Sequence, residues 1–448
     1  MTFSACLWLG LFPLLQGGTY ARLTHDKWVI MLILTGVTLL CFLTDHLSRR
    51  RKGAVSAGAG YGRPEKNVPA LFLLRFLPCL LVSALLLWTV LSCLAGSSGP
   101  ETWWLGEGAR YEGLAACLCY FALFFCFFFS RVNLKAVLLS AAFGAAVFFL
   151  IVLLQRSGGN PLGLYPGSKS YATNYEFQGT TGNIDMGTGY LLLLAGLFLH
   201  GLIRSVPEYR SRPESSAARP PLFRRGVPVL PVILSVSFLI VLWLILTMGV
   251  QFGIVSLAFL LLFTLFRFLP RRFRLPLLIL LVVLALLVVW FWPGQAGGLW
   301  ELREILHGRA RPSFGSNRIA VWDYSLRLAR ENLLFGGGPG SFPSRFNRYL
   351  RNSGLAIPEE QDGVPLPHYF DNPHNEYIAL LTDRGLPALL LYAALLMFAL
   401  YRRREAGYPR PVPCTAAVLC YAVQAFFSFS ICIVAPMFWV LLALSFRE

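Results

Sequence analysis

The sequence predicts an all-α, polytopic membrane protein of about 12 transmembrane helices, in which one large and partly helical loop interrupts the apolar chain. Hydrophobic residues make up 56% of its 448 residues and charged residues 14%, whereas charged residues make up about a quarter of a soluble protein. Several apolar runs reach the roughly 20 residues that a helix needs to cross about 30 Å of hydrocarbon. Because hydrocarbon offers the backbone no hydrogen-bond partner, each span is expected to be helical.

The apolar runs divide the chain into three parts. Nine transmembrane helices with short loops are expected in residues 1–299, a large polar loop in 300–385, and three more helices in 386–448. The first apolar run has neither the basic start nor the Ala-x-Ala end of a signal peptide, so it is predicted to be a span. The spans are placed near residues 3–20, 28–45, 69–95, 113–130, 134–154, 186–204, 228–248, 251–269, 275–292, 386–401, 413–429 and 431–446.

Positive charge predicts the orientation, since short cytoplasmic connections are enriched in Lys and Arg. The even-numbered connections are strongly basic, whereas the odd-numbered ones contain few basic residues. We therefore expect a multi-pass protein of the cytoplasmic (inner) membrane with both termini in the cytoplasm and a periplasmic loop. The basic connections contain Arg49–Lys52 with Arg63 and Lys66, Arg131 with Lys135, Arg204–Arg225, Arg271–Arg274, and Arg402–Arg404 with Arg410.

The net charge of +17 does not indicate a nucleic-acid partner, because the basic residues lie in short loops beside apolar spans. The ten cysteines lie mostly inside apolar runs and form neither a CxxC pair nor a cluster with histidines, so no metal site is expected. They are interpreted as small apolar packing residues. The composition predicts the lipid bilayer as a partner.

The polar loop contains a predicted amphipathic helix from Asn317 to Asn332. Apolar residues recur at helical spacing, and Ser316 or Asn317 can cap its start. Arg318 lies in the first turn and Trp322 follows four residues later, so both side chains are expected on one face. A tryptophan on a helix that lies along the membrane surface would reach the lipid headgroups.

A glycine-rich segment follows, from Gly336 to Gly340. Glycines let the backbone approach a ligand closely, and successive N–H groups can form an anion-binding nest, with Gly338 and Gly340 as candidate contacts. The segment lacks both the Gly-x-Gly-x-x-Gly pattern and the Lys-Ser/Thr pair of phosphate loops. A tight turn between two helices explains it equally well.

His374 is a candidate general base in the segment Asp371–Tyr377. Asn372 can cap the following helix with Pro373 in its first turn, and the helix dipole would then disfavour the protonated imidazole. A neutral imidazole can accept a proton from a substrate hydroxyl. Taken alone, His374 is more simply explained as a surface histidine bonded to a neighbouring loop. His368 is a second candidate base, with no predicted helix to position it.

The order of these features resembles the O-antigen ligase/polymerase family, in which a comparable sequence fills a large periplasmic loop between late membrane helices. The resemblance covers residues 310–390 closely, and the membrane layout extends it over most of the chain. Residues 178–183 are similar to a glycine- and asparagine-bearing stretch of that family. The resemblance implies a GT-C-like fold. It rests on Arg318-x-x-x-Trp322, the glycines between Asn332 and Phe342, and His374-Asn375-Glu376-Tyr377 with Leu381 and Gly385.

This resemblance implies a glycosyl transfer at the outer face of the cytoplasmic membrane. The donor would be a glycan carried on undecaprenyl diphosphate. The acceptor hydroxyl would belong to lipid A–core in a ligase of lipopolysaccharide biosynthesis, or to another lipid-linked glycan in a polysaccharide polymerase. No nucleotide sugar, metal or other cofactor is expected.

The same resemblance implies a role for each site residue. Arg318 would hold the diphosphate, because arginine is permanently charged and binds phosphate oxygens through two N–H groups. His374 would take the acceptor proton. Trp322 would pack against the isoprenoid or a sugar face, and Asn375 would orient His374 or a sugar hydroxyl. Solvent or headgroup contacts are expected for the remaining loop arginines, Arg327, Arg330, Arg345, Arg348 and Arg351.

One position departs from the family pattern. The family usually carries an arginine after an outward-facing break between two spans, whereas this chain has Gln251 there. Glutamine carries no charge with which to neutralise phosphate. Either Arg309 or Arg311 reaches the site as a substitute, or the donor is handled differently, or the chain is inactive.

Two other functional classes stay open. A transporter or flippase for a lipid-linked or anionic solute suits a chain of about 12 helices. Against it, the spans carry almost no mid-membrane charge, which is the usual mark of an ion pathway, and the sequence has no internal repeat. A non-catalytic subunit of a polysaccharide assembly is consistent with Gln251.

Overall fold

The computed structural model describes residues 1–56, 69–210, 229–355, 357, 369–401 and 412–447. Helices dominate this part of the chain. Its strands form a single antiparallel pair, β1 (Phe177–Gln178) with β2 (Gly182–Asn183). The all-α class predicted from the sequence is confirmed.

Eight helices of the described residues are long and apolar enough to cross a membrane, and four shorter apolar helical segments accompany them. Each predicted span overlaps one of these helices, which confirms the polytopic architecture. The long helices are α2 (Leu23–Ser56), α3 (Pro69–Ala95), α6 (Leu134–Arg156), α7 (Ile184–Arg210), α8 (Val229–Met248), α9 (Gln251–Phe268), α10 (Arg271–Trp290) and α14 (Glu376–Tyr401). The shorter ones are residues Thr2–Leu14, α5 (Leu114–Phe128), α15 (Pro413–Gln424) and α16 (Ala435–Ser445).

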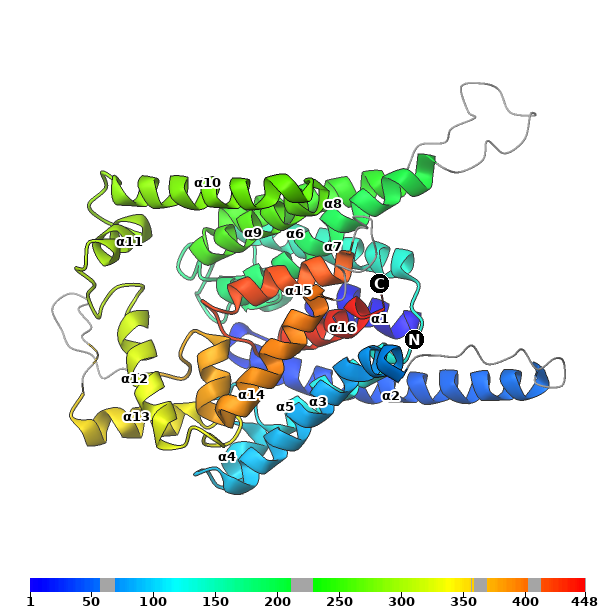
Figure 1. Ribbon diagram of the computed structural model, residues 1–448, viewed down its shortest axis with the longest axis horizontal. Helices are drawn as coiled ribbons and strands as arrows, with labels where there is room; N and C mark the ends of the chain where they lie inside the picture. The colour runs from blue at the N-terminus through cyan, green and yellow to red at the C-terminus, as the bar shows by residue number, and fades with distance from the viewer. Residues whose placement is uncertain (57–68, 211–228, 356, 358–368, 402–411, 448) are drawn as a thin grey trace.

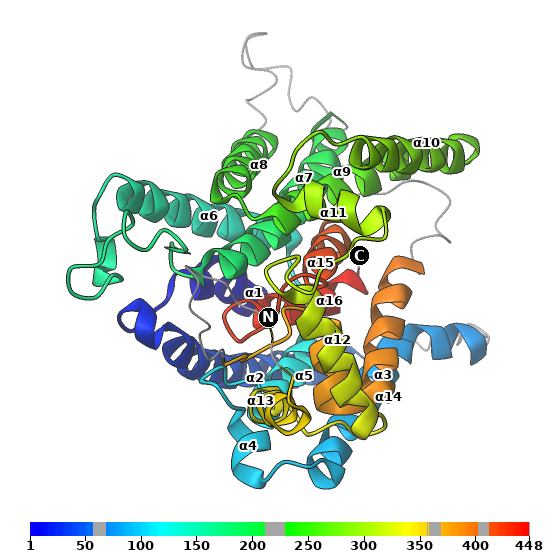
Figure 2. The same ribbon diagram turned by 90° about the vertical axis from the view of Figure 1, so that its left-hand side faces the viewer.

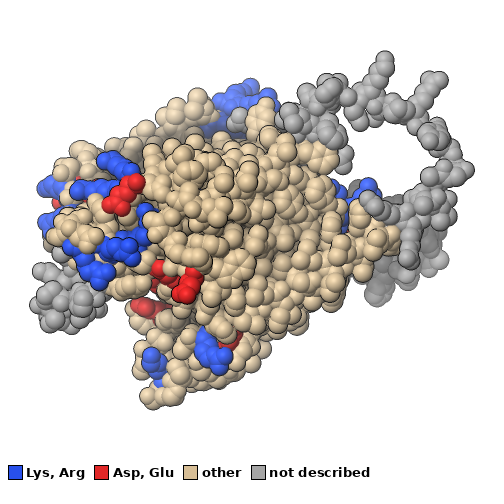
Figure 3. Space-filling model, turned by 90° about the horizontal axis from the view of Figure 1, so that it is seen from below, with Lys and Arg blue, Asp and Glu red and all other residues tan. Residues whose placement is uncertain are grey.

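The polar loop forms one end of the helix bundle. It contributes α11 (Gly298–Leu306), α12 (Arg318–Glu331) and α13 (Phe342–Ser353), while both chain termini lie toward the opposite end (Figure 1). Between the two ends the visible surface is almost entirely uncharged, and Lys and Arg gather mostly beside the loop helices (Figure 3). The basic connections at residues 57–68, 211–228 and 402–411, which help to predict the orientation, lie outside the described residues.

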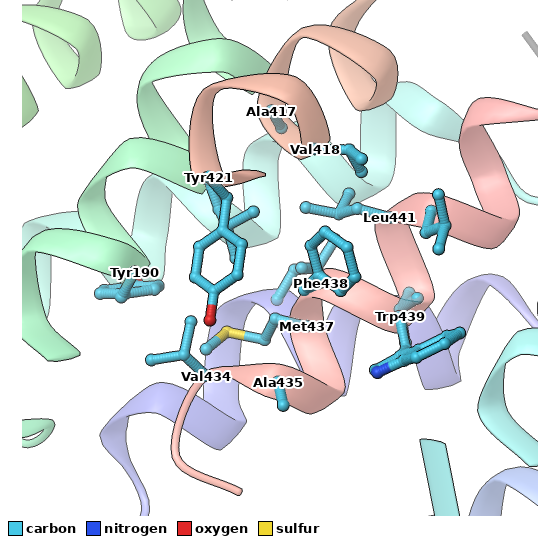
Figure 4. Close-up of a cluster of buried hydrophobic side chains, with 14 of the residues drawn as sticks. Tyr190, Ala417, Val418, Tyr421, Val434, Ala435, Met437, Phe438, Trp439 and Leu441 are labelled. Carbon is cyan, nitrogen blue, oxygen red and sulfur yellow. The ribbon is translucent and has the colours of Figure 1, made fainter. Parts of the chain in front are cut away.

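The core of the bundle is packed around α7, which contacts α8 and α15 closely. Gly196 of α7 faces the backbone of Ala417 in α15, and a Cβ at this position would collide with it. Small residues allow such close helix approach in membranes. Figure 4 shows how Tyr190 of α7, Tyr421 of α15 and Phe438 of α16 meet in the same buried cluster. This cluster belongs to the core of the bundle on which the loop is mounted.

The first apolar segment is broken rather than continuous to residue 20. It consists of α1 (Thr2–Cys6), the π-helix η1 (Leu7–Leu11) and the 3-10 helix η2 (Phe12–Leu14). The fully buried Lys27 of α2 donates through Nζ to the carbonyls of Phe12 and Pro13, at 2.8 Å each. The Leu15 N–H and Thr180 Oγ1 also donate to the carbonyls of Phe12 and Pro13, at 3.2 and 2.6 Å, so the lysine adds a second donor to each at this helix end. The other short helices are η3 (Tyr20–Arg22), α4 (Pro100–Leu105) and η4 (Pro161–Gly163).

Helix α14 joins the loop to the membrane bundle. It begins at Glu376, before the predicted span at 386, but its backbone is non-helical at Gly385, where φ is 79°. A Cβ at Gly385 would collide with the carbonyl of Leu334, so the kink lets the connection after α12 pack against α14. The predicted span therefore forms the second half of α14, and the first half belongs with the loop.

Candidate functional site

Helix α12 forms close to where the sequence predicts it, and it carries Arg318 and Trp322 one turn apart on one face. Its start lacks a side-chain cap. Asn317 has a left-handed backbone with φ of 66°, and Arg318 Nη1 donates to the carbonyl of Gly315 at 3.2 Å. In the view onto the loop end, α12 crosses in front of α14 (Figure 2). The helix thereby brings both side chains to the segment that precedes α14.

Trp322 holds that segment in place. Its Nε1 donates to the carbonyl of Pro373 at 2.9 Å, and its ring packs against Phe426 and Phe427 at centroid distances of 5.6 and 6.1 Å. The neighbouring residue His374 is thus positioned by a helix that lies about 50 residues earlier in the chain. The structure brings Arg318, Trp322 and His374 together.

His374 adopts a left-handed backbone conformation, with φ of 49°. Its N–H donates to Asn372 Oδ1 at 2.8 Å, and its ring meets Phe429 edge to face at a centroid distance of 5.3 Å. The Nδ1 atom is enclosed and has no hydrogen-bond partner among the described residues. The surface histidine bonded to a neighbouring loop, which the sequence allowed, is therefore not what the structure has.

The helix cap differs from the prediction. Asn375, rather than Asn372, caps α14, because its Oδ1 accepts from the N–H groups of Tyr377 and Ile378 at 3.0 Å each. Pro373 lies before the helix, and Asn372 instead closes the turn around His374. Asn375 Nδ2 is enclosed without a partner in the described chain, which leaves this donor for a ligand.

The surroundings of His374 favour the neutral imidazole. Burial, and after it the positive charge of Arg318, lowers the pKa of His374 to about 4, while Asp371 opposes this effect and Arg110 adds to it. Burial is thus the main cause, where the sequence pointed to the helix dipole. Arg110 Nε donates to Asp371 Oδ2 at 2.9 Å, so these two charges form a pair beside the ring. A neutral ring can accept a proton.

Arg318 keeps one buried hydrogen-bond donor, its Nε, that no group of the described chain uses. Its guanidinium carbon lies 5.1 Å from the ring centroid of Phe252, the second residue of α9, and its Nε is enclosed without a partner in the described chain. Burial lowers the pKa of Arg318, whereas the negative charges of Asp185 and Glu301 raise it. Because an arginine stays protonated throughout, the site presents a fixed cation whose Nε–H is unpaired within the described chain.

Neither Arg309 nor Arg311 is brought to Arg318. Arg309 forms a two-pronged pair with Glu304, in which its Nε and Nη2 lie 3.0 and 3.1 Å from the carboxylate oxygens. Arg311 is exposed beside the rings of Trp300 and Phe314. Gln251 is an exposed residue at the start of α9, directly before Phe252. Its side chain lies against Gly298, because a Cβ added to that glycine would be only 2.6 Å from Gln251 Oε1.

Arg156 is the basic residue that sequence reasoning missed near this break between α8 and α9. Its Nη1 donates to Thr247 Oγ1 at 2.8 Å, in the last turn of α8, and its guanidinium carbon lies 5.2 Å from the ring centroid of Trp243. Its Nε and Nη2 donate to Gln178 Oε1 at 3.1 and 2.9 Å. The signal available in the sequence was the stretch 178–183, which forms the β1–β2 hairpin.

The glycine segment is a packing joint, and it does not form the anion-binding nest. The N–H groups of Gly337 and Gly338 donate to carbonyls of Thr382 and Asp383 at 3.1 and 2.8 Å, and the N–H of Gly340 donates to Asp383 Oδ2 at 2.9 Å. These donors are therefore occupied by α14. The tight turn between α12 and α13 is the interpretation that fits the geometry.

Arg345 is also not solvated as expected. Only 9% of it is exposed, because its Nη1 donates to the carbonyl of Thr382 at 2.7 Å behind the glycine turn. Arg327, by contrast, is exposed, pairs with Asp323 on its own helix at 2.6 Å and lies over the ring of Tyr324. Arg345 is thus part of the scaffold of the loop.

A cavity lies on the other side of the His374 segment. Its walls come from the connection 106–113 before α5, from the first half of α14, and from the turn between α15 and α16. No sequence pattern links these segments. The charged residues among those that line it are Glu107, Arg110, Glu112, Asp371, Glu376, Asp383 and Arg384.

Glu112 stands out among these groups. Burial raises the pKa of Glu112 to about 8, although a 2.8 Å hydrogen bond from the Tyr120 hydroxyl opposes this shift. Within the described residues, no group of three or more His, Cys, Asp and Glu side chains is arranged to hold a metal ion. His368, the second candidate base, lies outside the described residues.

Comparison with known protein families identifies the domain that contains this site. Residues 235–393 match the family model described as O-antigen ligase. The match runs from α8 through the loop into α14, and it includes Arg318, Trp322 and His374. No curated protein matches the chain. The molecule is thus a polytopic membrane protein that carries, in residues 235–393, the domain of the O-antigen ligase family, a family of glycan-transferring ligases and polymerases.

Proposed function

We propose that this protein is a glycosyltransferase at the outer face of the cytoplasmic membrane. It transfers or polymerises a glycan from an undecaprenyl-diphosphate donor onto the hydroxyl of an acceptor, which is lipid A–core in a ligase and another lipid-linked glycan in a polymerase. The observation that carries the proposal is the joint placement of a fixed cation, Arg318, and an unprotonated base, His374, through the bond from Trp322 to Pro373.

The donor side of the site suits a leaving diphosphate. When the bond between the anomeric carbon and the diphosphate oxygen breaks, negative charge accumulates on the phosphate oxygens, and a preorganised guanidinium stabilises it. The Nε of Arg318, which has no partner in the described chain, is available for this purpose. The aromatic rings of Phe252 and Phe427, which stack at 4.0 Å beside it, offer the apolar contact that an isoprenoid chain needs.

The acceptor step assigns the proton to His374. The neutral imidazole takes the proton of the acceptor hydroxyl while the acceptor oxygen forms the new bond to the anomeric carbon. The diphosphate leaves on the opposite face, so the configuration at this carbon inverts. A pKa near 4 ensures that the ring is free to accept the proton, although it also weakens the base. Binding of the anionic donor at Arg318 neutralises a charge that lowers this pKa, so the donor strengthens the base.

The location of the reaction follows from charge and topology. The loop helices and the termini lie at opposite ends of the bundle (Figure 1). The basic even-numbered connections belong on the cytoplasmic side, so the loop with Arg318 and His374 faces the periplasm, where lipid-linked glycans are available as donor and acceptor.

The proposal is tested by His374→Ala and Arg318→Ala in a strain that lacks its own enzyme. Both variants should lose surface glycan, because the base or the phosphate-binding cation is missing. Arg327→Ala is the matched control, since Arg327 lies on the same helix, is exposed, and has Asp323 and Tyr324 of that helix as its contacts. Normal glycan levels with either site variant would show that the assigned residues do not act in transfer.

A second experiment identifies the reaction itself. The purified protein is supplied with a glycan on undecaprenyl diphosphate and with either lipid A–core or a second lipid-linked glycan, and the product is analysed by mass. Transfer to the first acceptor marks a ligase and chain growth a polymerase. Movement of the donor across a liposome membrane without any transfer would replace the proposal by a flippase.

A further inference from the structure

Helix α11 exposes its apolar side chains. They recur at spacings of three, four and seven residues, which place them on one face of the helix, and each is 39–50% exposed. A helix on the surface of a soluble protein turns its apolar face toward the core and its polar face toward water. The reverse orientation of α11 therefore indicates an apolar neighbour outside the described chain. The exposed residues are Leu299, Leu302, Ile305 and Leu306.

Lipid is the neighbour of the preceding helix, α10. No side chain of α10 is buried by the part of the chain that the structure describes, although this helix is long and apolar enough to span a membrane. It ends at Trp290, which is 45% exposed. Tryptophan is enriched at the level where spans leave the hydrocarbon for the headgroups. We therefore infer that lipid surrounds α10 up to its last residue.

Helix α11 lies at the same level as the end of α10. The two helices pack against each other, with α11 beside the loop end of α10 (Figures 1 and 2). The ring of His307, directly after α11, stacks on that of Trp290 at a centroid distance of 4.1 Å. Because Trp290 marks the headgroup level, this stack places the end of α11 at that level too. The apolar face of α11 thus begins where the lipid-covered helix ends.

The opposite face of α11 contacts the connection to α12. Glu301 Oε2 accepts from the N–H of Gly315 at 3.0 Å, and the ring of Trp300 meets that of Phe314 at a centroid distance of 5.4 Å. These contacts leave the apolar face turned away from the protein. A helix that presents one face to polar groups and an apolar face to the outside fits the boundary between headgroups and acyl chains.

The same connection leads to the candidate cation. Gly315, whose N–H is bound by Glu301, accepts from Arg318 Nη1 through its carbonyl at 3.2 Å. Both contacts act on one residue, so a displacement of α11 relative to the bilayer is transmitted to the start of α12. Trp322, for which the sequence suggested a headgroup contact, donates to Pro373 instead. Helix α11 is therefore the element that relates the depth of the bilayer to the position of Arg318.

We propose that α11 is a membrane-surface anchor, whose exposed apolar face inserts into the phospholipid leaflet on the side of the loop and holds the turn before Arg318 at headgroup depth. The partner is a phospholipid surface, because the apolar face adjoins a helix that lipid already covers. The second half of the proposal rests on the proposed function, since the diphosphate of a lipid-linked donor lies at this depth. The lipid contact itself does not depend on the reaction.

Photocrosslinking tests the lipid contact without any transfer. The photoreactive residue p-benzoylphenylalanine replaces Leu302 in the full-length protein, which is irradiated in phosphatidylcholine nanodiscs, and the adducts are identified by mass. We expect a phospholipid adduct with a yield similar to that of the same residue at Val288 of α10, which is exposed on the span. The yield should be at least about tenfold lower at Arg327, an exposed and charged position of α12. A crosslink to a second copy of the chain, or no lipid adduct, would overturn the anchor.

Transfer kinetics test the connection to Arg318. Leu302→Asn combined with Ile305→Asn should raise the KM for a donor with a full-length polyprenyl chain in the bilayer at least about fivefold, because α11 no longer keeps its depth. The KM for a short-chain donor that dissolves in water should stay unchanged, since this donor reaches the site from solution. Leu162→Asn is the control and should change neither KM, because Leu162 is an exposed leucine of η4 in another connection.

The outcomes separate the anchor from the proposed function. The double variant is compared only if its thermal unfolding curve equals that of the unmodified protein. Equal changes of the two KM values, or no change in either, would refute the role of α11 in setting the depth of Arg318. Absence of transfer by the unmodified protein would refute the proposed function, whereas a lipid adduct from position 302 would still establish the membrane contact.

Discussion

The indole of Trp322 donates a hydrogen bond to the carbonyl of Pro373 at 2.9 Å, and this bond connects α12 to the residue beside the candidate base. Arg318 lies one turn before Trp322 on the same helix face. This hydrogen bond thus links the helix that carries the cation to the segment that carries the base. We therefore expect the transfer rate to depend on the position of α12.

Trp322→Phe should reduce the transfer rate without unfolding the protein. Phenylalanine keeps the packing against Phe426 and Phe427 but loses the bond to Pro373, so the free energy of unfolding should fall by only about 1 kcal/mol. A misplacement of His374 by about 1 Å can cost up to about 100-fold in rate, and we expect a decrease of at least about tenfold. Single-turnover rates and thermal unfolding measure the two effects.

The control for this change is Trp104→Phe. Trp104 belongs to α4, is largely exposed and contacts the neighbouring Trp103. Trp104→Phe should therefore leave the transfer rate unchanged. A normal rate in Trp322→Phe would mean that the segment 371–375 holds His374 without help from α12.

Sequence periodicity predicted the parts of the site that lie on one element. Hydropathy located the spans because each helix must satisfy its own backbone in hydrocarbon, and the amphipathic pattern located α12 with Arg318 and Trp322 on one face. The helix cap was assigned incorrectly because Asn372 and Asn375 are both good caps, and only the observed bonds to Tyr377 and Ile378 distinguish them.

Contacts between distant segments could not be predicted in this way. Glu112 and Glu376 line one cavity although more than 250 residues separate them, and no local pattern records such a meeting. The glycine turn shows the same limit. Its spacing fits an anion nest as well as a packing joint, and only the carbonyls of Thr382 and Asp383 show that its N–H groups are occupied.

The transfer rate should depend on pH in a way that reports His374. The imidazole is neutral above its pKa of about 4, so the rate should stay constant from neutral pH to about pH 5 and fall below about pH 4, as protonation removes the base. Arg318 lowers this pKa, and Arg318→Gln should therefore raise it toward the ordinary value of about 6.5.

This shift can be measured even if Arg318→Gln transfers slowly. The ring signals of His374, assigned through His374→Gln, are followed by NMR across the pH range in protein with labelled histidine. The matched variant Arg327→Gln should leave the pKa of His374 unchanged, because Arg327 is exposed and pairs with Asp323. If the pKa of His374 is the same in Arg318→Gln as in the unmodified protein, the charge of Arg318 does not lower the pKa of His374.

Arg156 should support donor binding next to the position of Gln251. Hydrogen bonds to charged groups contribute about 1.5–3 kcal/mol, so Arg156→Gln should raise the KM for the lipid-linked donor by about 10-fold or more. Adding Gln251→Arg to this variant should restore part of the affinity, since it returns a cation to the break between α8 and α9. Lys169→Gln serves as a control for net charge in the same connection.

The outcome distinguishes two roles of Arg156. If it only stabilises the β1–β2 hairpin through Gln178, Arg156→Gln will lower the unfolding temperature, and Gln251→Arg will not restore donor affinity. If it carries charge for the donor, the second substitution acts on the KM of the donor and leaves that of the acceptor unchanged.

Gly385→Ala should disconnect the loop from the membrane bundle. Its φ of 79° is unfavourable for any residue with a Cβ, and the added methyl group would collide with the carbonyl of Leu334. Strain costs about 1–3 kcal/mol and overpacking a further 1–3 kcal/mol or so, so we expect a loss of about 2–6 kcal/mol in the free energy of unfolding. Gly354→Ala is the matched control, because Gly354 has φ of 62° but no atom within 4 Å of an added Cβ. Gly354→Ala should lower the free energy of unfolding by only about 1 kcal/mol.

Similar unfolding midpoints for Gly385→Ala and Gly354→Ala would show that α14 can straighten at Gly385. The kink would then not be what holds the glycine turn and His374 against the bundle.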